Sequence, residues 1–134
     1  MKGRYESEDR LFRLRKEIAE RAQVVYDDWE QDEEGACDEY GCGGICDTIA
    51  DEIVDVLDRA GIDARSQHDD SENHTSVLAR LPDGIYGVDI PPSVYETGEW
   101  YVYKKRSGVV FDESDVIVEK IFDADEAEEI WSQE

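Results

Sequence analysis

The chain has 134 residues, of which 40% are hydrophobic and 10% aromatic, enough for one domain with a modest core. Asp and Glu number 36 against 14 Lys and Arg, and the resulting net charge of −22 repels nucleic acid and anionic membranes. Direct nucleic-acid binding is therefore excluded. No apolar run approaches the ~20 residues that span a bilayer, and residues 1–10 lack the apolar segment of a secretory signal, so we expect no membrane contact and a cytoplasmic location.

The acidity itself has three explanations that the sequence leaves open. Carboxylates keep a protein soluble, and they also keep a surface hydrated at high salt, with which the nine Arg and five Lys are compatible. The third explanation is mimicry, in which rows of carboxylates imitate nucleic acid and occupy a basic groove on a protein partner.

The periodicity of apolar residues changes along the chain and predicts an α+β fold. Residues 8–30 carry an apolar stripe at three- and four-residue spacing, and residues 46–60 carry a wider one, which predicts two helices separated by an acidic loop over 27–41. Beyond Gly61 the period becomes two. We expect two helices packed on a mainly antiparallel sheet of four or five strands, drawn from residues 62–67, 74–81, 85–90, 100–105 and 115–121, and a last helix over 123–133.

The organisation expected is a single domain over residues 1–134. Within it we separate an N-terminal helix and acidic loop (1–34), a core of the cysteine-containing helix and the sheet (41–122), and a short C-terminal helix (123–134).

Three cysteines lie within ten positions, and the chain has no other. Cys37, Cys42 and Cys46 could be metal ligands, redox or structural thiols, or one activated nucleophile with two bystanders. An odd number does not fit a fully paired disulfide framework. The zinc alternative would use the three cysteines with His74, but the spacing C-x4-C-x3-C lacks the C-x2-C pair typical of such sites. A small buried core residue is the plainest reading of Cys46.

Cys46 has the surroundings that a nucleophile needs. Gly41, Gly43 and Gly44 precede it, and it opens the second predicted helix, whose N-terminal N–H groups favour a thiolate and can receive an oxyanion. A general base must then be His68 or His74, the only histidines. His68 lies at the edge of an acidic loop, whereas His74 begins a predicted strand.

These residues resemble the transglutaminase-like branch of the papain-like cysteine superfamily. The resemblance covers residues 41–92 and consists of the cysteine at a helix start, the GIDAR stretch over 61–65, a strand opening with histidine (HTSVLARL) and a strand closing on Asp before prolines (GVDIPP). It implies a papain-like core in which Cys46 is the nucleophile, His74 the general base and Asp89 the orienting carboxylate. It also implies acyl transfer from an amide or ester without a cofactor. In that branch an aromatic often follows the histidine, where this chain has Thr75 and Ser76.

The predicted hairpin sets a geometric condition on this triad. A two-residue turn at Asp83-Gly84 would pair Leu78 with Asp89 and leave His74 four residues away, ~13 Å along the strand. A bulge, a different turn or strong twist would then be needed. His74 and Asp89 do share one face, opposite the apolar face expected to pack on the helices, so a nucleophile on a helix would have to reach round an edge.

Aromatic residues around the two prolines could line a substrate cleft or could simply pack the strands. We name Tyr95 and Trp100 from this region, with Tyr40 and Gly44 before the cysteine, as candidate substrate-binding residues.

The function favoured by these observations is a cysteine-dependent acyl-transfer enzyme, a peptidase, amidase or transamidase, acting on a peptide or protein substrate. The alternative is a non-enzymatic acidic inhibitor of viral, phage or other mobile-element origin that blocks a basic host defence protein by nucleic-acid mimicry. A third reading keeps the fold but leaves the triad unused, as in a degenerate enzyme that binds partners.

Overall fold

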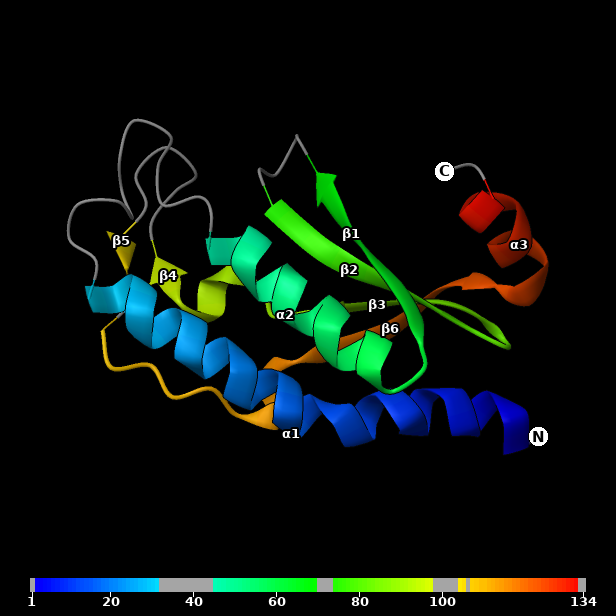
Figure 1. The fold of residues 1–134 in the computed structure, drawn as a ribbon, viewed down its shortest axis with the longest axis horizontal. Coiled ribbons are helices and arrows are strands. Elements are labelled where there is room, and N and C mark those ends of the chain that lie inside the picture. The colour runs from blue at the N-terminus through cyan, green and yellow to red at the C-terminus, as the bar shows by residue number, and fades with distance from the viewer. Residues whose placement is uncertain (1, 32–44, 70–73, 98–103, 106, 133–134) are drawn as a thin grey trace.

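Figure 1 shows the computed structural model, which describes residues 2–31, 45–69, 74–97, 104–105 and 107–132. These residues form an α+β structure, as the sequence predicts. Its helices are α1 (Lys2–Gln31), α2 (Ile45–Arg59) and α3 (Ala124–Ser132), with short 3₁₀ turns η1 (Pro92–Val94) and η2 (Glu113–Asp115). Its strands are β1 (Asp63–Asp69), β2 (His74–Leu81), β3 (Gly84–Asp89), β4 (Glu96–Thr97), β5 (Lys104–Lys105) and β6 (Ile117–Asp123).

The main sheet has the order β1-β2-β3-β6, and every neighbouring pair is antiparallel. Strands β4 and β5 form a separate two-stranded pair. Helices α1 and α2 lie on one face of the main sheet, and α3 lies at the far end from the start of α2 (Figure 1). None of the helices in the described ranges is long and apolar enough to cross a membrane.

Helix α1 is longer at both ends than the sequence pattern predicts. It begins at Lys2 rather than at residue 8 and ends at Gln31, one residue beyond the predicted helix, so the overlap of that helix with the predicted acidic loop at 27–30 is helical. The last turns stay helical because Tyr26 and Trp29 are buried in the core, where Tyr26 packs on Phe111 at 5.4 Å between ring centroids. The hydrophobic gain of burying aromatic side chains therefore outweighs the acidic composition of this segment.

The apolar faces of α1 and α2 meet the odd-numbered side chains of β2 in one hydrophobic core. The apolar residues of the predicted helix over 46–60 that line this core or pack against it are Ile49, Ala50, Ile53, Val54, Val56 and Leu57, whereas Ala60 lies exposed beyond the helix end. On the opposite face of the sheet, Leu78 and Ile85 pack against Ala127 and Trp131 of α3. The reverse face is thus covered by α3 near the β2–β3 turn.

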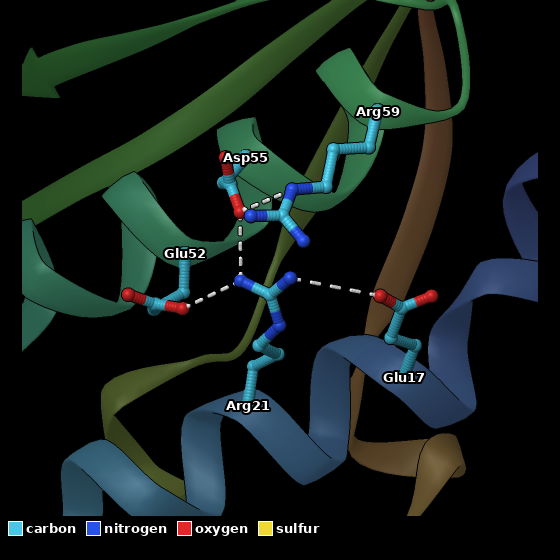
Figure 2. Close-up of polar contacts among 5 residues, drawn as sticks. All are labelled: Glu17, Arg21, Glu52, Asp55 and Arg59. Atoms are coloured by element: carbon cyan, nitrogen blue, oxygen red, sulfur yellow. Dashed lines mark hydrogen bonds and ion pairs between the residues drawn. The ribbon is translucent and has the colours of Figure 1, made fainter.

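Polar contacts on the outer surface join α1 to α2. Arg21 of α1 donates to Glu52 at 2.9 Å and to Asp55 at 2.8 Å, and it is also paired with Glu17 (Figure 2). Asp55 in turn contacts Arg59 at 3.1 Å. The Arg21 guanidinium therefore contacts three carboxylates at the seam between the two helices, and Arg59 contacts one of them as well.

The end of α2 is set by Gly61. The Ile62 N–H donates to the Leu57 carbonyl at 2.9 Å, and the Gly61 N–H donates to the Asp58 carbonyl at 3.0 Å, which is the Schellman pattern. Gly61 has φ +80°, a conformation that costs a residue with a side chain about 1–2 kcal/mol. The GIDAR stretch therefore closes the helix and starts β1 two residues later.

Replacing Gly61 tests this helix end. We expect Gly61→Ala to lower the free energy of unfolding by about 1 kcal/mol, and Gly61→Asn to lower it by less, because Asn tolerates left-handed backbone. Urea denaturation followed by circular dichroism measures both. Equal losses in the two variants would show that φ is not the cause.

Candidate active site

His74 and Asp89 meet at the end of the sheet where α2 begins. His74 is the first residue of β2 and Asp89 the last of the antiparallel strand β3, so both lie at one end of the hairpin (Figure 1). The His74 Nε2 and Asp89 Oδ2 atoms are 2.8 Å apart, a charge-assisted hydrogen-bond distance. The side chains are 15% and 26% exposed, so solvent screens this contact only in part.

The predicted turn position is wrong, because the hairpin turn lies one residue earlier in the chain. The earlier turn changes the strand register and brings His74 close to Asp89. Leu81 pairs with Gly84, so the turn consists of Pro82 and Asp83. The register is regular from there to Val77 opposite Val88, and one more step sets Ser76 opposite Asp89. His74 is then two residues, rather than four, from the position opposite Asp89. This offset is ~6.6 Å of strand, which two side chains on the same face can bridge. A register shift between Ile85 and Tyr86 does occur in β3, but it affects the pairing of β3 with β6 and not with β2.

Gly84 explains why the turn falls where it does. Its φ is +147°, and a Cβ placed there would lie 2.1 Å from the carbonyl oxygen of Phe122 on β6. Glycine is therefore required at a paired position of β3 against β6, and the two residues before it are left to make the turn.

Cys46 reaches this pair from the first turn of α2. Its side chain is partly exposed, and it is close enough to His74 for each group to shift the pKa of the other. Burial raises the pKa of the Cys46 thiol. The contact with His74 and a backbone hydrogen bond from Thr75 lower it by more, so its pKa lies below the ordinary value. The sequence predicts that a nucleophile on a helix would have to reach round an edge of the sheet. This is unnecessary, because the Cys46 sulfur approaches β2 at the first two residues of that strand.

His74 is strongly biased toward its charged form. The hydrogen bond to Asp89 and, after it, the contact with Cys46 raise the pKa of His74 to about 10. Its Nδ1 atom is buried and has no hydrogen-bond partner among the described residues. A protonated His74 therefore lies beside a thiol whose pKa is lowered.

A second set of polar side chains lies on the other face of β2, directly beside the cysteine. Thr75 is 5% exposed, the single buried polar residue among those described. Its hydroxyl donates to the Asp47 carboxylate and is 2.9 Å from His68 Nδ1 on β1. Sequence reasoning missed this role for Thr75. The period-two pattern, which turns Thr75 toward the helices, could have indicated it.

Of the remaining predicted site residues, the structure describes only Tyr95. Tyr95 is 1% exposed and packs edge-on against Trp29 at 5.9 Å and against Phe111 at 6.4 Å, so its place is the core and a role in contacting substrate is not supported. Tyr40, Gly44, Trp100, Cys37 and Cys42 lie outside the described residues. Within the described ranges no three His, Cys, Asp or Glu side chains are grouped as metal ligands.

Comparisons of the chain with protein-family models, with curated proteins and with solved structures found no match. The transglutaminase-like resemblance therefore stays a prediction. What bears on function is the placement of Cys46, His74 and Asp89.

The His74–Asp89 pair can be tested by nuclear magnetic resonance. We expect the His74 ring to stay protonated until about pH 10, because the Asp89 carboxylate stabilises its charged form. Asp89→Asn removes the carboxylate that is the largest cause of the raised His74 pKa, so this variant should have a lower His74 pKa. Ring ¹⁵N shifts, assigned with His74→Gln, measure it. A wild-type midpoint at the ordinary histidine value would contradict the ion-pair description.

The thiol itself can be tested by alkylation. Iodoacetamide should modify Cys46 at a pH below that of an ordinary thiol, because only the thiolate reacts and His74 stabilises it. Mass spectrometry of the Cys46 peptide across pH gives the midpoint. We expect His74→Gln to move that midpoint upward, and an unmoved midpoint would show that His74 does not activate the thiol.

Proposed function

We propose that this protein is a cysteine-dependent acyl-transfer enzyme that acts on an amide or ester of a peptide or protein. The observation that carries the proposal is the 2.8 Å contact between His74 Nε2 and Asp89 Oδ2, with Cys46 close enough to the same imidazole for the two groups to shift each other's pKa. A nucleophile, a base and a group that orients the base are the parts that covalent acyl transfer requires.

In the proposed reaction, the Cys46 thiolate attacks the substrate carbonyl carbon and the carbonyl oxygen takes up the electron pair. N–H groups in the first turn of α2 lack intrahelical partners and are suited to hold that oxyanion. The C–N bond then breaks, and the His74 imidazolium donates its proton to the leaving amine. A thioester on Cys46 remains.

The second half of the reaction regenerates the ion pair. Neutral His74 accepts a proton from water, or from a second amine, as that nucleophile attacks the thioester carbonyl. The C–S bond breaks, and Cys46 leaves as a thiolate beside the newly protonated imidazole. Asp89 keeps the imidazole oriented and stabilises its positive charge in both halves. Attack by water makes the enzyme a hydrolase, and attack by an amine makes it a transamidase.

The site favours this function over nucleic-acid mimicry. A mimic needs carboxylates spaced like phosphates and gains nothing from a raised histidine pKa beside a lowered thiol pKa. The net charge of −22 is compatible with both functions and does not separate them.

Acylation of the resting enzyme by p-nitrophenyl acetate tests the proposal without knowledge of the natural substrate. We expect a burst of one nitrophenolate per chain and a single acetyl group on Cys46, seen by peptide mass spectrometry. Cys46→Ala should abolish the burst, and Asp89→Asn should slow it on the order of 10²-fold. The rate should rise with pH through the lowered Cys46 pKa and fall again near pH 10 as His74 loses its proton.

The matched control is the double variant Cys37→Ser with Cys42→Ser, which should keep the burst. Addition of a primary amine then distinguishes the two outcomes, because faster release of the acetyl group indicates a transamidase. Acetylation spread evenly over the cysteines, or a burst that survives Cys46→Ala, would rule out the proposed nucleophile.

A further inference from the structure

We infer that Thr75 is a positioning residue, which binds the Asp47 carboxylate and so limits the negative field of Asp47 at the neighbouring Cys46 sulfur. The inference rests on the proposed function in taking the Cys46 thiolate as the reacting group. It concerns residues that the triad does not include.

The hydrogen bonds around Thr75 have a direction that follows from counting protons. An ionised carboxylate only accepts, so the single hydroxyl proton of Thr75 goes to Asp47 Oδ1. The Thr75 oxygen must then accept from His68, 2.9 Å away, which requires His68 to carry a proton on Nδ1. The chain of donors runs from β1 through β2 to the first turn of α2.

The position of Asp47 makes this chain relevant to the thiol. Asp47 follows Cys46 directly, and its negative charge raises the pKa of the Cys46 thiol, opposing the effect of His74. A hydroxyl that donates to Asp47 withdraws part of that charge and fixes the direction of the carboxylate. The backbone of Thr75 meanwhile stabilises the thiolate, so one residue acts on the sulfur by two routes.

The other charged groups near the sulfur come from neighbouring elements. His74 on β2 acts on Cys46 directly, Asp89 on β3 acts through His74, and His68 on β1 acts through Thr75. Asp51 lies one turn further along α2 and is exposed. Removing the Thr75 hydroxyl breaks its hydrogen bonds to Asp47 and His68 and leaves the His74–Asp89 contact in place.

The test follows alkylation of Cys46 by iodoacetamide from about pH 5 to about pH 10, read on the Cys46 peptide. Thr75→Val keeps the backbone hydrogen bond and removes the hydroxyl. It should lower the alkylation rate at about pH 6 by roughly threefold, the scale of a screened charge interaction, and move the profile to higher pH. Thr75→Ser restores the hydroxyl and should restore the wild-type profile. Asp47→Asn should move the profile to lower pH.

The decisive comparison is Thr75→Val made in the Asp47→Asn background, where it should have no effect on the profile. An undiminished effect there would show that Thr75 acts by another route, and an unchanged profile in Thr75→Val alone would overturn the inference. Ser66→Ala on β1 is the control for loss of a strand hydroxyl, and thermal unfolding checks that each variant folds.

Two further outcomes remain decisive. If Thr75→Val does not fold, an Asp47→Asn profile identical to wild type overturns the inference by itself. An ordinary wild-type midpoint with the Asp47-dependent shifts intact would instead contradict the proposed function and leave the role of Thr75 standing.

Discussion

The register between β2 and β3 is the constraint on which the site depends. Side chains alternate across a strand, so a slip of one residue would place His74 and Asp89 on opposite faces, and the slip of two that a turn at Asp83-Gly84 would cause would set them about 13 Å apart along the strand. The two-residue turn at Pro82-Asp83 avoids both. It lies at the opposite end of the hairpin from the chemistry, yet it sets the 2.8 Å contact between His74 and Asp89.

The core and the site share the same two strands but use different faces. Odd-numbered residues of β2 point into the core beneath α1 and α2, whereas His74 points the other way and Thr75 points toward the helix start. The sulfur of Cys46 can contact both because it approaches where the strand begins. The packing of α2 on the sheet thereby fixes where Cys46 lies relative to His74.

Local patterns predicted most of the elements and part of the site. The α2 apolar face, the positive φ of Gly61 and the shared face of His74 and Asp89 all follow from short-range periodicity and backbone preference. The turn position did not follow, because Pro82-Asp83-Gly84 allows two turns, and the choice depends on the close approach of Gly84 to Phe122 on a strand far along the chain. Thr75 and Tyr95 were misjudged for the same reason, since their partners are brought together only by tertiary packing.

The Arg21 cluster has a consequence for the influence of dissolved ions on this molecule. Self-repulsion in a chain of net charge −22 works against compaction, and the carboxylates of α1 and α2 face one another across the helix seam with a single shared guanidinium between them. Dissolved cations can take over part of the role of that guanidinium, because mobile counter-ions screen like charges wherever solvent reaches them. Dissolved salt is thus expected to affect the contact between α1 and α2, and α2 is the helix that holds Cys46 against the sheet.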